Sequence, residues 1–290
     1  MKRNPHRARH RRICGGSARS YPPAAAQGRN YCTMIINDLS NTKENTISLD
    51  IRRVSSQGAS FFEKREVIKE HHMDILINEV KAMTVVCTPS DLLNLAAGRM
   101  ISEGYVDDPE EIESISICES GARCRVFLKE TPALCADAPE IPTCCTDNIN
   151  HLSADSPLPF LGYHDSICDS HIFKLAECLK KDTSLHRATS GTHSAYLMYK
   201  GELVYSCSDI GRHNALDKAI GEMYLKAHAP EECIIYTTGR VPTDMVKKAI
   251  RAKLPVLVSK SVPTADAAEL SEKHGLRLIC RAWPDSFDLY

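Results

Sequence analysis

The densest group of side chains able to bind a ligand or take part in chemistry lies between Ser208 and Lys218, in the run S-D-I-G-R-H-N-A-L-D-K. A polar cluster of this density is costly inside a fold unless it binds something, so it indicates a binding site at a strand-to-helix turn. On the helix expected after Gly211, His213 and Asp217 are four residues apart and can face each other. The alternative is that Asp217 only orients His213 and so holds the loop.

Two later strand-to-helix turns also carry small polar residues, T-T-G-R-V-P-T at 237–243 and S-K-S-V-P-T at 259–264. In parallel α/β sheets such turns lie together at the carboxyl ends of the strands. The three turns contain the cations Arg212, Arg240 and Lys260. Backbone N–H groups at helix N-termini with cations nearby favour a phosphate-bearing ligand, so we expect a nucleotide-like site at this edge. The threonines that end the two later turns could instead serve only as helix caps.

Three further candidates lie outside these turns. His193, in T-S-G-T-H-S-A at 189–195, can reach a ligand at the same edge, although a lone histidine is more often structural. Cys144 and Cys145 stand in a polar loop after a proline. An exposed thiol can ionise and act as a nucleophile, whereas a buried one is inert. The alternative is that these two cysteines are an incidental surface pair.

The composition is that of an ordinary globular protein. The 290 residues are 43% hydrophobic and 25% charged, with a net charge of −1. This balance gives no global attraction to nucleic acid or to an anionic membrane, and no apolar run approaches the roughly 18 residues that span a bilayer. The 13 cysteines are scattered, without a Cys-x-x-Cys pair or a secretory signal. We expect reduced intracellular thiols, most of them small buried hydrophobes.

The chain divides into four stretches by composition. Residues 1–33 are rich in Arg, His, Gly and Pro and lack acidic residues, which favours a disordered extension, or an upstream start codon with Met34 as the true start, over a transit-like leader. Residues 46–130 predict a small α+β domain, with a hairpin over 74–87 and strands at 112–118 and 123–128. Residues 131–162 are rich in Pro, Ala, Asp and Ser and predict a linker loop that carries Cys144 and Cys145.

From residue 163 to 290, short apolar runs alternate with amphipathic helices, which predicts βαβ units and a mostly parallel sheet. The strands are expected at 195–199, 203–207, 233–237, 255–259 and 276–280. The helices are expected at 167–180, from the polar cluster to about 226, at 243–252 and at 264–274. The fold class is therefore α/β, with the smaller α+β domain before it.

These motifs together resemble the formate dehydrogenase accessory sulfurtransferase (FdhD/NarQ) family. The resemblance runs from about residue 46 to the end of the chain. It is carried by C-T-P-S-D-L at 87–92, S-E-G at 102–104, S-G-T-H-S-A at 190–195, D-I-G-R-H-N-A-L-D-K at 209–218, T-G-R at 238–240 and S-V-P-T at 261–264.

The resemblance implies a cytoplasmic homodimer with a cytidine-deaminase-like C-terminal domain. It implies that Cys145 or Cys144 takes sulfur from a cysteine desulfurase as a persulfide and delivers it to the molybdenum bis-(molybdopterin guanine dinucleotide) cofactor, which is then inserted into formate dehydrogenase. A guanine nucleotide could mimic that cargo, and no metal site is expected. The implied cofactor-binding residues are His193, Asp209, Gly211, Arg212, His213, Asn214, Asp217, Lys218, Gly239, Arg240, Lys260, Ser261, Thr264, Arg281, Ala282, Trp283, Pro284, Asp285 and Ser286.

The sequence departs from the family pattern at three places. Where the family usually has Cys-Gly-x-Cys-Gly, residues 144–148 read C-C-T-D-N, so the second cysteine is replaced by Asp147 or Asn148. Where the family has a G-F-A-R-G-type run, residues 280–285 read C-R-A-W-P-D, with Trp283 at the position of the arginine. In the third, Ser208 stands where the family usually has Glu.

Two other functions are therefore weighed against sulfur transfer. A cofactor-binding chaperone that has lost sulfur transfer is favoured by the missing second cysteine. A zinc-dependent deaminase would need His-x-Glu and Pro-Cys-x-x-Cys to hold the metal and shuttle protons. The sequence reads H-S-A from His193 and contains no Cys-x-x-Cys, which argues against a deaminase.

Overall fold

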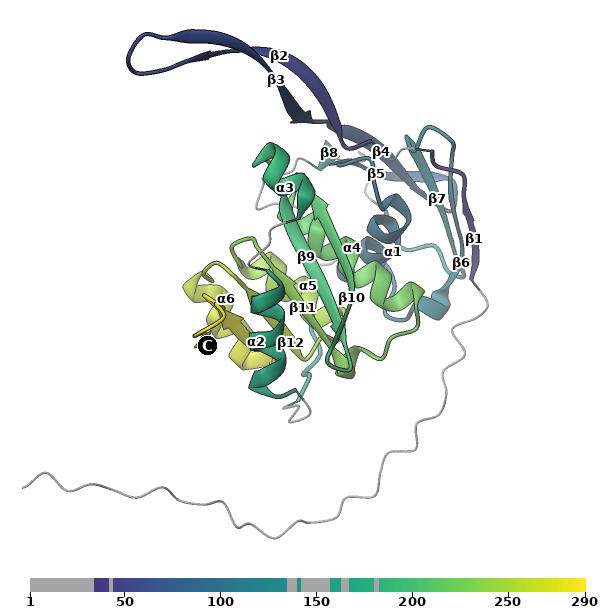
Figure 1. The fold of residues 1–290 in the computed structure, drawn as a ribbon. Coiled ribbons are helices and arrows are strands. Elements are labelled where there is room, and N and C mark those ends of the chain that lie inside the picture. The colour runs from purple at the N-terminus through teal and green to yellow at the C-terminus, as the bar shows by residue number, and fades with distance from the viewer. Residues whose placement is uncertain (1–33, 42–43, 135–139, 142–156, 163–166, 180–182) are drawn as a thin grey trace, which may run out of the picture.

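The computed structural model describes residues 34–41, 44–134, 140–141, 157–162, 167–179 and 183–290. The predictions for residues 1–33, for Cys144 and Cys145, and for most of the 131–162 linker lie outside the described residues. The described chain forms two six-stranded sheets with helices packed between them, and a long two-stranded hairpin that projects from one side (Figure 1).

The N-terminal sheet is built around the predicted hairpin, which is confirmed. Its strand order is β1 (Ile35–Asp38), β6 (Ile112–Ile117), β7 (Arg123–Leu128), β4 (His71–Ile77), β5 (Val80–Cys87) and β8 (Glu140–Ile141). Strands β4 and β5 join through Asn78 and Glu79, whose φ angles of 47° and 67° give the left-handed conformation that a tight hairpin turn needs. Strands β1 and β8 lie outside the range 46–130 predicted for this domain, so the sheet recruits chain from both sides of it.

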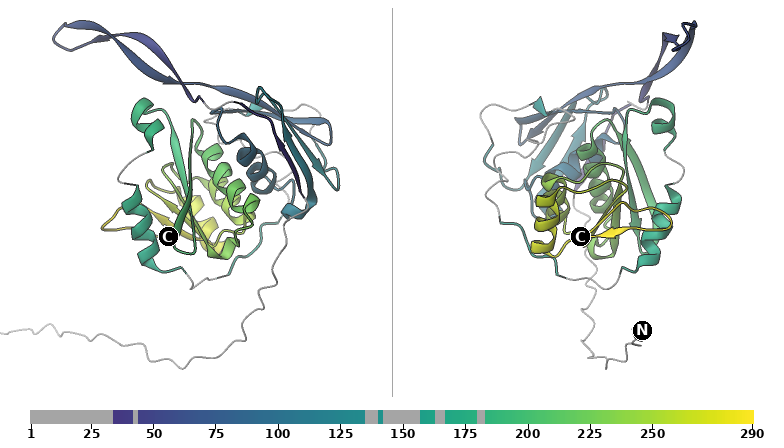
Figure 2. Two further views of the ribbon diagram at one scale, coloured as in Figure 1. Left: turned by 45° about the vertical axis from the view of Figure 1, so that its right-hand side comes forward. Right: turned by 90° about the vertical axis from the view of Figure 1, so that its left-hand side faces the viewer.

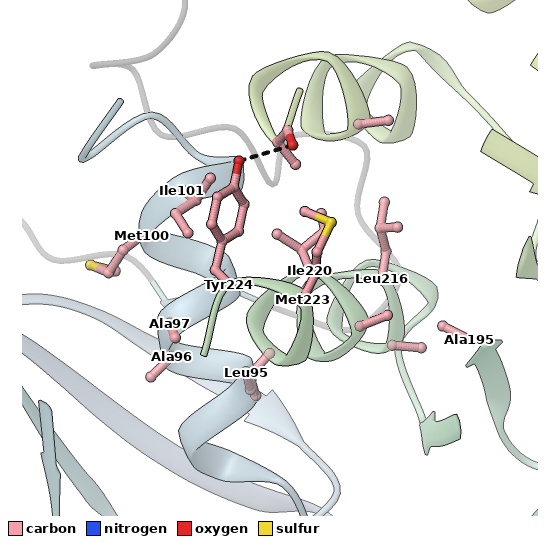
Figure 3. Packing of buried hydrophobic residues seen from close by; sticks show 14 of the residues in the cluster. Leu95, Ala96, Ala97, Met100, Ile101, Ala195, Leu216, Ile220, Met223 and Tyr224 are labelled. Atoms are coloured by element: carbon pink, nitrogen blue, oxygen red, sulfur yellow. Dashed lines mark hydrogen bonds between the residues drawn. The ribbon is translucent and has the colours of Figure 1, made fainter. Parts of the chain in front are cut away.

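One helix of each half packs against the other and joins the two sheets. Helix α1 (Leu92–Ser102) crosses helix α4 (Arg212–Leu225) so closely that a Cβ at Gly98 would lie 1.8 Å from the carbonyl oxygen of Asp217. A Cβ at Gly221 would lie 1.9 Å from the carbonyl oxygen of Asn94. Figure 3 shows the apolar side chains around this crossing, among them Leu95, Ala96, Met100, Leu216, Ile220 and Met223. Because one cluster of buried residues includes side chains of both sheets, the two halves share a core.

The C-terminal sheet has the strand order β10 (Glu202–Asp209), β9 (His193–Tyr199), β11 (Cys233–Thr237), β12 (Val256–Ser259), β13 (Arg277–Cys280) and β14 (Asp288–Leu289). The prediction of a mostly parallel sheet is wrong. The β11–β12 and β12–β13 pairs are parallel, whereas β10–β9, β9–β11 and β13–β14 are antiparallel. The reason is local, because Lys200 and Gly201 both have positive φ and fold β9 directly back onto β10.

Helices cover both faces of this sheet. Helices α4, α5 (Thr243–Arg251) and α6 (Ala265–His274) contribute to the shared core on the side of the N-terminal sheet. Helix α2 (Asp169–Cys178) buries Ile172, Leu175 and Ala176 in a second cluster, with residues that point to the opposite face of β9, β11 and β12. The other helical segments of the described residues are α3 (Ser184–Thr189) and the 3-10 turns η1 (Pro109–Glu111) and η3 (Pro230–Glu232).

The projecting hairpin, which we call the arm, consists of β2 (Thr46–Val54) and β3 (Ser60–Ile68). It extends well away from both sheets in the two views of Figure 2. Its strands pair with each other, and nearly all of its residues are exposed, including Phe62 at 79%. The arm was not predicted from the sequence.

Candidate functional site

The register of the C-terminal sheet brings the predicted turns to one edge, as expected. His193 at the start of β9 is paired with Asp209 at the end of β10. Thr237 at the end of β11 lies between Ala195 of β9 and Ser259 of β12. The carboxyl ends of β10, β11 and β12 therefore meet the beginning of β9.

Backbone hydrogen bonds hold these turns together. The Ser194 N–H donates to Thr238 Oγ1 at 2.9 Å, and the Thr238 N–H donates to the Ser194 carbonyl at 3.0 Å. The Lys260 N–H donates to the Thr237 carbonyl at 3.0 Å. Ser259 Oγ donates to the Gly239 carbonyl at 2.6 Å. Lys260 and Thr238 are thus fixed relative to each other by the sheet itself.

A cavity of about 480 Å³ opens at this edge, within the range of about 300–1,000 Å³ that is usual for small-molecule and cofactor sites. The described residues that line it are His186, Ser190, Gly191, Thr192, His193, Thr238 and Lys260. Two predicted site residues, His193 and Lys260, are therefore brought together. The other five were missed as site residues, although four of them belong to polar turns noted in the sequence. His186 had no signal, because it is a lone histidine on the short helix α3.

The cavity is surrounded by cationic and titratable side chains. Burial, together with the neighbouring Arg212, His186 and His213, holds the pKa of His193 below its usual value. Arg212 is the first residue of α4, and its stem packs on the backbone of Gly239, where a Cβ would lie 2.8 Å from the Arg212 Cβ. Lys260 lines the cavity directly. An anion bound here would relieve repulsion among positive groups.

The expected pairing of His213 with Asp217 is wrong. His213 Nε2 lies 2.6 Å from Asp244 Oδ2 of helix α5, and both side chains are buried. Burial would raise the pKa of Asp244, but the hydrogen bond and the charge of His213 outweigh it and lower that pKa. The His213–Asp244 pair therefore ties α4 to α5, one residue after Arg212. Helix α4 is buried over most of its surface, so residues one turn apart find partners on different elements.

Asp209, Asn214 and Lys218 are also turned into the protein. Lys218 Nζ lies 2.7 Å from Asp209 Oδ2, which also accepts from the N–H of Thr88 at 3.0 Å. Asn214 Nδ2 donates to Asp209 Oδ1 at 2.9 Å and to the Val86 carbonyl at 2.8 Å. Burial would lower the pKa of Lys218, but the charge of Asp209 raises it. These groups, with Gly211 donating its N–H to Asp209 Oδ1, anchor the C-terminal half to strand β5.

Asp217 belongs to a second buried network. Its carboxylate lies 3.0 Å from Lys248 Nζ and 3.4 Å from Arg99 Nε, and it accepts from Ser102 Oγ at 2.6 Å. Lys248 also contacts Glu103. The network joins α1, α4 and α5. Asp217, one of the charged residues of the 208–218 motif, therefore has its partners inside the protein. A direct contact of Asp209, Asn214, Asp217 or Lys218 with a ligand stays a prediction.

The remaining predicted residues lie around the same edge. Arg240 is exposed, Thr264 caps α6 by accepting from the Ala267 N–H, and the Ser261 N–H donates to Ser259 Oγ. In the run 281–286, Arg281 has a left-handed φ of 47° and its N–H donates to the Ser261 carbonyl at 2.8 Å. Ala282 is buried, Pro284 is half-buried, and Trp283, Asp285 and Ser286 are exposed. The Trp283 ring lies beside Lys260, whose Nζ is 5.3 Å from the ring centroid.

The described cysteines fit the expectation for buried thiols. Cys87, Cys124, Cys207, Cys233 and Cys280 are buried, and burial raises the pKa of each to about 12. Cys168 and Cys178 are exposed. In the part of the chain that the structure describes, no three His, Cys, Asp or Glu side chains gather as they would around a metal ion. The same residues include no helix that is long and apolar enough to cross a membrane.

Fold and site define a two-sheet α/β protein with a polar, ligand-sized cavity, lined by Lys260 and two histidines, at the edge of its C-terminal sheet. Residues 68–290 match the model of the FdhD/NarQ family, and the chain belongs to this family.

Similar proteins carry consistent names. The chain is 29% identical over 231 residues to the sulfur carrier protein FdhD of Listeria monocytogenes serotype 4b, covering 77% of this chain and 88% of that protein. It is 28% identical to the sulfur carrier protein FdhD of Burkholderia mallei, covering 81% and 92%. A crystal structure of a protein assigned as a formate dehydrogenase accessory protein from Desulfotalea psychrophila has the same fold, with a TM-score of 0.71 and 24% identity over 85% of this chain and 96% of that chain.

Proposed function

We propose that this protein carries sulfur as a cysteine persulfide from a cysteine desulfurase to the molybdenum bis-(molybdopterin guanine dinucleotide) cofactor, and that formate dehydrogenase activity requires this step. Its similarity to sulfur carrier proteins supports sulfur transport, and its structural similarity to a protein assigned as a formate dehydrogenase accessory protein supports the link to formate dehydrogenase. The observation that carries the proposal is the ligand-sized cavity at the sheet edge, which Lys260 lines and beside which Arg212 lies.

The cofactor is the substrate in this proposal, and its dinucleotide arms are recognised through phosphate. Lys260 lines the cavity, and Arg212 and His193 are close enough to influence each other electrostatically. Charge-assisted hydrogen bonds from such groups to phosphate oxygens are among the strongest that proteins make. The other cofactor-binding residues implied by the family resemblance, including Arg240, Ser261 and the run 281–286, surround this position and belong to the same proposal.

Cys145, or its neighbour Cys144, is the proposed sulfur carrier. The thiolate takes the outer sulfur from the persulfide of the desulfurase, and each transfer leaves a thiol on the donor. Release of that sulfur as sulfide to molybdenum needs two electrons, which a second thiol would supply by forming a disulfide. Because the second motif cysteine is replaced by Asp147 or Asn148, the adjacent cysteine or an external thiol has to supply them.

Mass spectrometry tests the persulfide directly. The full chain is incubated with a cysteine desulfurase and free cysteine, its intact mass is measured, and the modified peptide is mapped. We expect one added sulfur atom on Cys145 or Cys144, lost in Cys145→Ala or Cys144→Ala. Cys168→Ala and Cys178→Ala are matched controls, because both thiols are exposed, and these variants should keep the added sulfur.

The second candidate is a cofactor-binding chaperone without sulfur transfer, favoured by the missing second cysteine. It predicts that no sulfur is added under the same conditions while a guanine nucleotide still binds. The wider expectations from the family, a cytoplasmic homodimer with a cytidine-deaminase-like C-terminal domain, complete the proposal. The mixed sheet with helices on both faces is compatible with such a domain.

A further inference from the structure

Lys260 belongs to two environments at once. Its side chain lines the 480 Å³ cavity, and its Nζ stands 5.3 Å from the centroid of the Trp283 ring. The position proposed for phosphate and the Trp283 ring are therefore both within reach of the Lys260 side chain. Its ring remains 46% exposed, although large apolar side chains are usually covered in this half of the protein.

The backbone around Trp283 is fixed on both sides. The Ala282 N–H donates to the Ser259 carbonyl at 3.0 Å, and the Ala282 carbonyl accepts from Tyr236 Oη at 2.9 Å. On the other side, the Trp283 N–H donates to the Ser286 carbonyl at 2.7 Å. The backbone that carries the exposed ring is thus held at the sheet edge, so the main chain needs little ordering when a ligand arrives.

A flat aromatic face beside a cationic group suits a nucleotide. Aromatic side chains bind bases by stacking, which tolerates different sequences because every base has a π face. A lysine near the ring can hold the phosphate of the same ligand while its stem stays against the aromatic surface. Inorganic phosphate or a sugar phosphate would use the lysine and leave the ring exposed.

We propose that Trp283 is the surface on which the base of the bound nucleotide stacks, with Lys260 joining this aromatic surface to the phosphate position. This inference rests on the proposed function, because it assumes that the cavity edge holds the dinucleotide arm of the cofactor. It gives Trp283 a specific role, stacking on the base, and this role distinguishes nucleotides from other phosphate-bearing ligands.

Intrinsic fluorescence gives a direct test, since Trp283 is the single tryptophan of the chain. GDP and inorganic pyrophosphate are titrated into the full-length protein, and binding is measured independently by equilibrium dialysis. We expect GDP to quench the tryptophan emission, and pyrophosphate to bind with a much smaller change. Trp283→Ala should weaken GDP binding roughly tenfold and leave pyrophosphate binding unchanged, whereas Trp283→Phe should retain most of the GDP affinity.

Two further variants complete the test. Lys260→Gln should weaken the binding of both ligands, because it removes the charge and keeps a polar side chain. Phe62→Ala, which truncates an exposed aromatic residue on the arm, is the matched control and should bind GDP like the unchanged protein.

The outcomes separate this inference from the proposed function. If GDP binds with unchanged emission and Trp283→Ala binds it normally, the stacking role is overturned while the phosphate site stands. If neither GDP nor pyrophosphate binds, the phosphate site fails and the stacking role fails with it. If Trp283→Ala loses both ligands equally, the ring supports the loop and does not read the base.

Discussion

His193 is the residue whose chemistry depends most on what occupies the cavity. Burial and the nearby Arg212, His186 and His213 keep its pKa below the ordinary value for histidine. A pKa below the ordinary value leaves His193 mainly neutral at neutral pH. A bound anion would favour the protonated form, so binding should raise the pKa of His193 and take up a proton.

This linkage predicts that anion binding strengthens as the pH falls. Between pH 8 and about pH 6 we expect the affinity for sulfate to increase roughly fivefold, since one added positive charge beside the anion contributes about 1 kcal/mol. Sulfate is the suitable probe because its own charge does not change in this range. The pKa of His193 is followed by NMR of its ring protons, with and without sulfate.

The conservative variant His193→Gln keeps a polar side chain and removes the titration. It should bind sulfate with a weaker pH dependence than the original protein does. An unchanged pH profile in His193→Gln, or a His193 pKa that does not rise with sulfate, would contradict this assignment.

The partners of individual charged residues could not be predicted from the sequence. The motif from Asp209 to Lys218 predicted a polar site, and Arg212 does lie near the cavity, as its electrostatic effect on His193 shows. Asp209 and Lys218, however, pair with each other and with Thr88, which is far away in the sequence. A charge cluster that binds another part of the same protein has the same composition as one that binds a ligand. Only the fold, which brings Thr88 after β5 to Asp209 and Lys218, distinguishes the two.

At the scale of elements, the crossing of α1 and α4 connects the two halves. Gly98 and Gly221 each face the backbone of the other helix, with hypothetical Cβ distances of 1.8 and 1.9 Å. Glycine costs helix stability of about 1 kcal/mol relative to alanine, so two glycines at this crossing are explained by the close approach. The approach also sets the position of Asp217, which joins Arg99 and Lys248 at the same junction.

We therefore predict that Gly98→Ala destabilises the protein although alanine is the better helix former. The overpacking should cost about 3 kcal/mol, measured as the free energy of unfolding in urea, because the helices have to separate and strain the buried ion pairs. Gly191→Ala is the matched control, since its Cβ would meet its nearest neighbour at 3.7 Å and its stability should change by less than about 0.5 kcal/mol. A Gly98→Ala variant as stable as the original would show that the crossing adapts freely.

Elements with strong periodicity were predictable, and their arrangement was not. The strands β6, β7, β11 and β12 and the helices α4 and α5 lie within a few residues of the predicted ranges. The alternation of strands and helices suggested a parallel sheet, but the short turn at Lys200 and Gly201 makes β9 and β10 a hairpin. Pairing directions follow from such turns and from crossovers, which periodicity does not encode.

The shape of the whole molecule is dominated by the arm, which was not predicted from the sequence. In its first strand Ile47, Leu49 and Ile51 alternate with polar residues, but its second strand, S-F-F-E-K-R-E-V-I, has no such alternation to mark it as the partner. Directly opposed residues share a face of the arm, and one face carries the pairs Ile47–Val67 and Arg53–Phe61. Ile47 and Phe61 on this face are 49% and 50% exposed. An isolated two-stranded hairpin is at best marginally stable in water, so this apolar face needs a covering surface.

In the proposed homodimer, the arm of a second copy is a suitable cover. The same face carries charges of both signs, with Glu63 Oε1 lying 3.7 Å from Arg53 Nη1, so it can be complementary to itself. We predict that replacing residues 47–67 by a short Gly-Ser connection converts the dimer to a monomer in sedimentation experiments. The melting temperature of the remaining fold should fall by only a few degrees, because the arm lies outside both buried clusters.

Point variants separate loss of the arm surface from loss of the arm itself. The double variant Leu49→Lys, Phe61→Lys should also be monomeric, because it places charge on the apolar face without shortening the chain. Phe62→Lys, on the opposite face and paired with Arg52, is the matched control and should remain dimeric. A shortened chain that still sediments as a dimer would exclude the arm as the contact, and an original chain that sediments as a monomer would contradict the homodimer itself.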